Sequence, residues 1–592
     1  MAQYDGHAQY QLSLMSTPSP SPSPTPTPSA SPQAEIRLPT FAIKFLRPIR
    51  AQSRLPSITD FPSITSTPPH RYTLACLPPP ELISTILDAF YACSGTLFYI
   101  ISRENSFDLF RSIYWGGARR TRAVLGELCA IAAVGAQYDY EGVTEAQRIA
   151  LWETAKAYTE DVRKGDEVRV IRVYTLCALF SIIEKRFVAM SYISAAMKIA
   201  VRYGLHKKND EAGLFKGRDR IPYRKCWRSL KFLESWMVGT LGRVAQHLSP
   251  SDTIDITPIE DGEDSPTTPT AEMVVVDVEV VQTELGRIAF LMEEIMKNVY
   301  GTGRCGINVT NAYMKKLECW LQELPKFMRL DTLLSDACDS STRRSILLVH
   351  LTYLGSMLLL TRPSLILLVS RHAGDPWLYD GTKEEARRYM DLCLEAAHNV
   401  ATVVGIIDNE QILFKRCWLV IGQSFNSLTL LLFQIVQKQR HHRPAADYAA
   451  DLASATLLVK VLLTCSDRDP LAKKFLDVVQ PYARLFPLSD PNLAAAFPHA
   501  PPASQPIDLD ALALHLLSII RTPFGGDGTV ETCVFQPPLA VSEESHAGFW
   551  PAKAYHVEVW RQDMAPTQKL PLKRLAGAAK SSLAYHTPRI PA

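Results

Sequence analysis

The stretch from Val170 to Lys207 reads VIRVYTLCALFSIIEKRFVAMSYISAAMKIAVRYGLHK and decides the fold class. Its first part, Val170–Ile183, is apolar on nearly every side, which predicts a buried helix. The second part carries apolar residues at helical spacing, which predicts an amphipathic helix. The apolar face of this second helix consists of Met190, Ile193, Met197, Ala200 and Val201.

Gly204 marks the expected end of the second helix. A glycine at the C′ position adopts the left-handed conformation without steric cost, and Leu205 can supply the hydrophobic contact that usually follows. Basic residues near this end favour the negative end of the helix dipole. They are Arg202, His206, Lys207 and Lys208.

Helix signals continue on both sides of this stretch. Upstream, a proline run precedes apolar residues at helical spacing, namely Leu82, Ile83, Ile86, Leu87 and Phe90. Downstream, helices are expected at about 272–299, 307–323, 341–360, 384–405, 411–437 and 445–465. Because strand alternation is scarce, the sequence predicts an all-α fold, with one large multi-helix domain over residues 78–485.

Both ends of the chain and one internal segment lack these signals. Residues 1–77 are rich in Ser, Thr and Pro, which predicts a disordered segment. The segment at about 246–270 is acidic and contains no Lys or Arg, which predicts a solvated acidic loop. Residues 486–592 are expected to form an irregular C-terminal region, with a short helix at 508–521.

Composition narrows the class of protein. The 592 residues include 63 basic and 60 acidic ones. This balance argues against a strong positive electrostatic field that would attract nucleic acid. None of the 12 cysteines form a C-x-x-C pair, so neither a zinc cluster nor a redox pair is visible, and a reducing compartment is expected. The first 15 residues are polar, so we expect no signal peptide.

Two apolar runs are candidates for membrane-spanning helices. Ile346–Leu360 is followed at once by Thr361, Arg362 and Pro363, so we expect it to be too short for a span of roughly 20 residues. Cys417–Val436 is long enough, but its polar residues would be poorly satisfied in lipid. These are Gln423, Ser424, Asn426, Ser427 and Gln434. We interpret both runs as buried core helices and expect no membrane contact.

Two segments together resemble the middle homology region of fungal zinc-cluster transcription factors. They are YISAAMKIAVRYGLHK at 192–207 and RKCWRSLKFLESWMVGTLGR at 224–243. The matching residues of the first segment are Ala196, Ala200, Gly204, Leu205 and His206. Those of the second include Trp227, Gly242 and Arg243, with Glu234 where the family usually has Asp. Weaker likenesses in the same order extend the resemblance over roughly 78–480.

The resemblance implies a helical transcription regulator in the nucleus. The family reads DNA with a six-cysteine, two-zinc cluster near the N-terminus, whereas residues 1–75 contain no cysteine. We therefore expect no sequence-specific DNA binding by this chain alone. The motif residues are expected to serve the fold rather than to contact a ligand. Gly204 permits a turn, Trp227 offers a large core anchor, and Arg243 can bond carbonyls at a helix end.

The sequence offers little for catalysis. Gly301–Gly306 matches G-x-G-x-x-G, but Glu293–Tyr300 before it predicts a helix where a dinucleotide site needs a strand, so we interpret it as a helix-to-helix turn. His441 and His442 lie in a basic segment that predicts a charged loop, with a nuclear import signal or a metal site as less favoured alternatives. Common catalytic motifs are absent, so we predict no enzyme, catalytic residue, cofactor or metal.

The leading hypothesis is a nuclear transcription regulator that acts through protein or small-molecule interactions. Its partner would be a zinc-cluster transcription factor or another protein, and its ligand a small-molecule effector. The alternatives are a cytosolic helical enzyme or metabolite-binding protein, and an incomplete sequence that lacks an upstream zinc cluster.

Overall fold

The computed structural model describes residues 71–138, 142–186, 188–207, 214–215, 220–241, 278–300, 304–330, 340–369, 378–379, 381–487, 491–498 and 507–521. Within these ranges the protein is helical, and the expected all-α fold is confirmed. The strands within them are one parallel pair of two residues each, β1 (Arg304–Cys305) and β2 (Leu378–Tyr379). Most of the expected disordered segment 1–77, the acidic loop at 246–270 and residues 522–592 lie outside the described residues.

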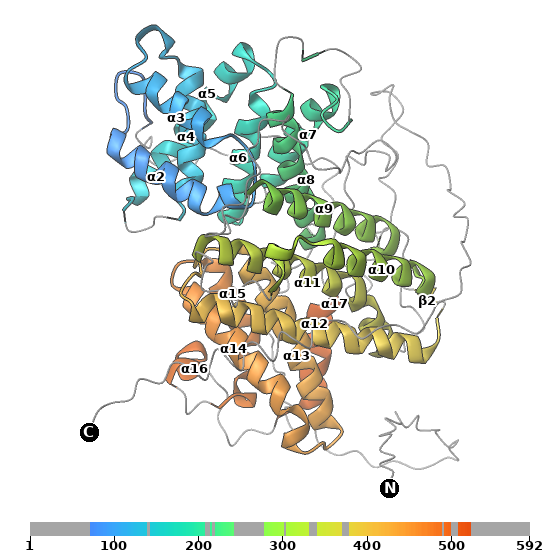
Figure 1. Ribbon diagram of the computed structural model, residues 1–592. Helices are drawn as coiled ribbons and strands as arrows, with labels where there is room; N and C mark the ends of the chain where they lie inside the picture. The colour runs from blue at the N-terminus through green and yellow to red at the C-terminus, as the bar shows by residue number, and fades with distance from the viewer. Residues whose placement is uncertain are drawn as a thin grey trace, which may run out of the picture. The chain divides into compact units, whose positions relative to one another are not determined.

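The helices follow one another along the chain as Figure 1 shows. Their bounds are α2 Pro80–Ala92, α3 Arg103–Tyr114, α4 Arg122–Gly135, α5 Glu145–Gly165, α6 Val170–Ile183, α7 Ala189–Arg202, α8 Ile221–Leu241, α9 Val278–Ile295, α10 Ile307–Glu323, α11 Ser340–Val369, α12 Lys383–Asn409, α13 Trp418–Arg440, α14 Ala449–Ser466, α15 Pro470–Val479, α16 Pro491–Ala496 and α17 Leu509–Arg521. A π-helix, Met296–Tyr300, directly follows α9.

Helix α6 lies at the centre of the first group of helices. Every residue of α6 except Tyr174 is buried, as its uniformly apolar sequence predicts. Helices α4, α5, α7 and α8 all pack against it. Between α5 and α6 the rings of Trp152 and Phe180 stack with centroids 4.1 Å apart.

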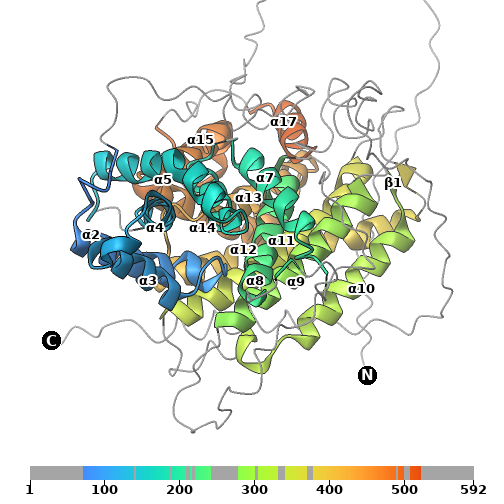
Figure 2. The same ribbon diagram turned by 90° about the horizontal axis from the view of Figure 1, so that it is seen from above.

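The second group of helices runs from α11 to α17. Helix α11 packs against α12, while α13 packs against α12, α14 and α17. Helix α9 packs against both α8 and α11, so it joins the two groups (Figures 1 and 2). The two groups also share an aromatic contact, because Trp236 of α8 meets Trp418 at the start of α13 with ring centroids 4.9 Å apart.

The expectation that the helix at 341–360 ends near Leu360 is wrong. Helix α11 continues through Pro363 to Val369. A proline has no backbone N–H, so the carbonyl of Leu359, four residues earlier, loses its helical donor. The buried hydroxyl of Tyr300 donates a hydrogen bond to that carbonyl. A contact from another part of the chain thus satisfies the group that the proline leaves free.

By length and composition alone, four helices among the described residues could cross a membrane. They are Ser340–Ile366, Lys383–Asn409, Trp418–Arg440 and Ala445–Ser466. The apolar windows of the first and third, which contain the two runs weighed above, are 94% and 83% buried inside the protein. Those of the second and fourth are 56% and 39% buried.

The boundary between α12 and α13 depends on local turn chemistry. Helix α13 begins at Trp418 rather than near 411, because Gln411 adopts a φ of 56° and closes α12, with the N–H of Ile412 bonded to the carbonyl of Ile407. The short helix expected at 508–521 is present as α17, and it packs against α13.

Replacing Tyr300 with Phe should lower the free energy of unfolding by about 1–3 kcal/mol, the range for a buried polar group left without a partner. Chemical denaturation of the purified protein measures this change. The matched background is Pro363→Ala, which restores a backbone N–H four residues after Leu359. In that background Tyr300→Phe should cost clearly less. Equal costs in the two backgrounds would contradict the proposed compensation.

Candidate functional site

The end of α7 has the geometry that its sequence predicts. Gly204 adopts a φ of 65°, its N–H bonds to the carbonyl of Val201, and the N–H of Leu205 bonds to the carbonyl of Ala200. These two bonds define a Schellman motif, in which a left-handed residue ends the helix. Ala196, Ala200 and Leu205 are all fully buried. The first part of the motif therefore supports the turn and the core.

His206 and Arg220 complete this turn. His206 is buried just beyond Leu205. Arg220, which precedes α8, donates from Nη2 to the carbonyls of Gly204 and Lys207, the latter at 2.8 Å. We expected Arg243 to bond carbonyls at a helix end. Arg243 and Gly242 lie outside the described residues, and Arg220 makes contacts of that kind here.

The second part of the motif lies along α8. Trp227 is buried, as expected of a core anchor, and its ring lies 5.9 Å from that of Phe290 on α9. Glu234 is buried too, and Lys231 Nζ lies 2.8 Å from Glu234 Oε2 and 2.8 Å from Glu293 Oε2. Burial raises the pKa of Glu293, with Lys231 opposing the rise. Burial also opposes the charge of Lys231, but the two carboxylates outweigh it and raise its pKa. This ionic triad fastens α8 to α9.

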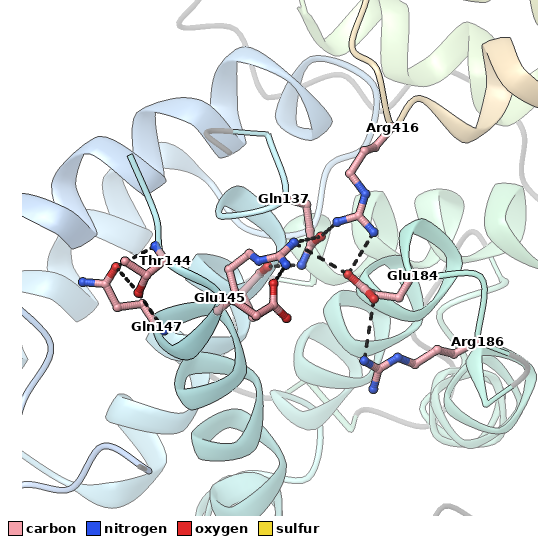
Figure 3. Close-up of polar contacts among 9 residues, drawn as sticks. Gln137, Thr144, Glu145, Gln147, Glu184, Arg186 and Arg416 are labelled. Atoms are coloured by element: carbon pink, nitrogen blue, oxygen red, sulfur yellow. Dashed lines mark hydrogen bonds and ion pairs between the residues drawn. The ribbon is translucent and has the colours of Figure 1, made fainter. Parts of the chain in front are cut away.

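A second polar cluster joins the two groups of helices, and we call it the charged junction. It comprises Gln137 after α4, Arg148 of α5, Glu184, Lys185 and Arg186 after α6, Arg416 before α13, and Asp469 before α15. In Figure 3 Glu184 lies between Arg416 and Arg186, with Gln137 beside Arg416. Residues from five separate parts of the chain thus meet at one place.

Glu184 is the carboxylate on which the arginines of the charged junction converge. Arg416 Nη2 lies 3.0 Å from Glu184 Oε1, Arg148 Nη1 lies 4.0 Å from the same oxygen, and Arg186 Nη2 lies 3.6 Å from Oε2. Arg148 and Arg416 also donate to Oε1 of Gln137. The side chains of Arg148 and Arg416 are each only 9% exposed, so their charges depend on protein partners rather than on water. For Arg148 these partners include Glu145 of α5, with which it forms a further ion pair.

Lys185 occupies the junction in a strained backbone conformation. It has a φ of 57° at the end of α6, where the N–H of Arg186 bonds to the carbonyl of Ser181. A side chain in this left-handed region costs free energy, and such residues tend to gather at functional sites. Lys185 Nζ lies 3.0 Å from the buried Asp469 Oδ2. Burial lowers the pKa of Lys185, and Asp469 opposes that change.

Side-chain caps at the starts of α5 and α15 help to position the residues of the charged junction. Thr144 and Gln147 form a capping box that starts α5 next to Arg148 (Figure 3). Asp469 caps α15 by accepting from the N–H groups of Leu471 and Ala472 through Oδ1, which leaves Oδ2 for Lys185. The junction is therefore held by helix ends, whose positions are set by the packing of the helices.

The chemistry of the charged junction is that of ion pairs rather than of metal binding or thiol attack. No group of three or more His, Cys, Asp or Glu suited to a metal occurs in the described part of the chain. Burial raises the pKa of the neighbouring Cys417 thiol, although backbone N–H groups, Lys185 and Arg344 oppose the rise. A thiol with a raised pKa is a poor nucleophile.

The structure describes the two glycine-rich and histidine-containing motifs only in part or as chain between helices. Arg304 and Cys305, inside the G-x-G-x-x-G match, form β1, and α10 follows Gly306, while a helix rather than a strand precedes the match. His441 and His442 follow the end of α13, and His442 takes a φ of 52°.

The charged junction was not predicted from the sequence. One signal was available, since Glu184–Arg186 are three charged residues directly after an apolar helix, with no glycine to end it. The identity of their partners was not visible, because Glu184 and Arg416 are 232 residues apart.

Gly204→Val should lower the free energy of unfolding by about 1–3 kcal/mol, the range for a strained backbone. A Cβ at Gly204 would meet no atom within 4 Å, so the cost arises from the positive φ alone. Gly165→Val is the matched control, since a Cβ there also meets no atom and Gly165 has no positive φ. Thermal unfolding should show a lower midpoint only for Gly204→Val. Equal midpoints would mean that the turn at Gly204 is not strained by a side chain.

Glu184→Gln should lower the free energy of unfolding by about 2–4 kcal/mol, because it leaves the buried guanidinium groups without their shared carboxylate. We place the value slightly below that of a fully buried pair, since Glu184 is 20% exposed. Asp108→Asn, which breaks an exposed pair with Arg111, is the control and should leave the unfolding midpoint nearly unchanged. Similar midpoints for the two variants would rule out a stabilising role for the junction.

Comparison with protein-family models, with curated proteins and with solved structures finds no match to this chain.

Proposed function

We propose that this protein is a nuclear transcription regulator of the fungal zinc-cluster type, and that this chain acts through protein or small-molecule interactions. It contains none of the paired cysteines with which that family holds its zinc ions. Access to DNA would therefore come from a partner, such as a zinc-cluster factor that this chain joins or sequesters.

The observation that carries the proposal is the arrangement of the motif residues from α7 to α8. Ala196, Ala200 and Gly204 build the end of α7, and Trp227 and Glu234 anchor α8 in the core. This succession of a helix, a left-handed turn and a second anchored helix supports the proposal. These residues support the fold, so they argue for the kind of domain and leave its ligand open.

The charged junction supports a role in regulation. It connects the ends of α4 and α6 with the starts of α13 and α15, so a shift in one group of helices would disturb the ion pairs that hold the other. A partner or small molecule that prefers one arrangement would shift the population of both groups together.

The proposal is tested by fusing the full chain to an unrelated sequence-specific DNA-binding domain in yeast. The fusion should change expression of a reporter that carries the matching sites, relative to the DNA-binding domain alone. The unfused chain should leave the same reporter unchanged, because specific recognition needs an element that reads base edges.

The variants Glu184→Gln and Asp108→Asn provide the matched controls for this reporter experiment. The first should weaken the effect of the fusion and the second should not. A folded fusion that enters the nucleus and leaves the reporter unchanged would overturn the proposal. A fluorescently tagged chain that stays in the cytosol would favour a helical enzyme or metabolite-binding protein instead.

A further inference from the structure

A hydroxyl, an imidazole and a carboxylate form a hydrogen-bonded series between α12 and α14. His398 of α12 has Nδ1 2.9 Å from Ser454 Oγ and Nε2 2.9 Å from Asp451 Oδ1, both on α14. Asp451 and Ser454 are three residues apart, so they share one face of α14 and both reach the same ring. The sequence could not show this group, because its histidine is more than 50 residues from its partners.

Asp451 is held as an ionised acceptor. Its second oxygen, Oδ2, accepts from Lys438 Nζ of α13 at 2.8 Å. Burial alone would raise the pKa of Asp451, but the hydrogen bonds from His398 and Lys438 outweigh it and hold the pKa below its ordinary value. The carboxylate is therefore fixed in position and charge by a third helix.

The ionised carboxylate determines which nitrogen carries the hydrogen when the imidazole is neutral. Asp451 can only accept, so His398 Nε2 carries the hydrogen and Nδ1 presents a lone pair. The Ser454 hydroxyl then donates to Nδ1. A hydroxyl that donates to a base oriented by a third group is the arrangement that activates a serine for nucleophilic attack.

Ser454 and His398, which would react, are partly accessible to solvent, whereas Asp451, which orients the imidazole, is buried. The His398 side chain is 31% exposed and Ser454 is partly exposed, whereas the side chain of Asp451 is 8% exposed. In the familiar serine triads the serine faces Nε2 and the acid faces Nδ1. Here the two nitrogens exchange roles, and either nitrogen can act as a base once the other holds the proton.

We propose that Ser454 is a nucleophilic hydroxyl that accepts an acyl group from activated esters, with His398 as its base and Asp451 as the positioning residue. The Ser454 oxygen bonds to the carbonyl carbon of the ester while His398 takes the hydroxyl proton. The bond from that carbon to the leaving aryloxide then breaks, and the aryloxide receives the proton. The products are an acylated Ser454 and the free phenol, one per chain. This chemistry goes beyond the regulatory function and does not depend on it.

The test treats the full chain with p-nitrophenyl acetate and locates the acetyl group by peptide mass spectrometry. Acetylation should be found at Ser454 and should disappear in Ser454→Ala. Ser466 is the matched control on the same helix, because its hydroxyl donates to the carbonyl of Leu463. Ser466→Ala should leave labelling at Ser454 unchanged.

Two further variants test whether Ser454 acts as a nucleophile or only forms a structural contact between helices. Asp451→Asn keeps the shape of the side chain but can donate to Nε2, which moves the imidazole hydrogen to Nδ1 and removes the base. It should slow acetylation of Ser454 by about 100-fold or more, as should His398→Gln. Circular dichroism checks that both variants fold. Labelling at other serines only, or equal rates at Ser454 in the folded Asp451→Asn variant, would overturn the proposal.

Discussion

A helix that is apolar on nearly every face has to be covered on nearly every face, and the first group of helices is arranged around that requirement. Helix α6 has no polar stripe to turn towards water, so α4, α5, α7 and α8 enclose it. Long parts of two of these neighbours are buried as well, 125–135 of α4 and 226–238 of α8. The charges of these segments are therefore confined to helix ends or drawn into the interior with partners.

Charges drawn into the interior explain much of the remaining architecture. Glu127 of α4 is fully buried and pairs with Arg169 and Arg172 at the start of α6. Lys231 is fully buried between two carboxylates of α8 and α9. Breaking such a pair is costly, because the remaining charge stays out of water without compensation. Buried ion pairs therefore restrict which helix ends can pack together. In the charged junction, ion pairs of this kind connect the two groups of helices.

The structure also separates residues that shape the fold from residues that are partly exposed to solvent. The motif residues around Gly204 and Trp227 are buried or define a turn, so their role is geometric. Ser454 and His398 lie on a partly exposed face between two helices. The proposed regulatory role and the proposed nucleophilic serine are compatible in one chain, because a fold does not limit the chemistry of the sites that it supports.

The sequence by itself determined the class of fold, the burial of α6 and the turn at Gly204. Helical periodicity and turn chemistry act over a few residues, so they can be read along the chain. Only the tertiary structure decided that α11 passes through Pro363, that Arg416 meets Glu184, and that His398 lies between Ser454 and Asp451. Each of these depends on a partner from another helix, and the packing of side chains between helices determines which helices become neighbours.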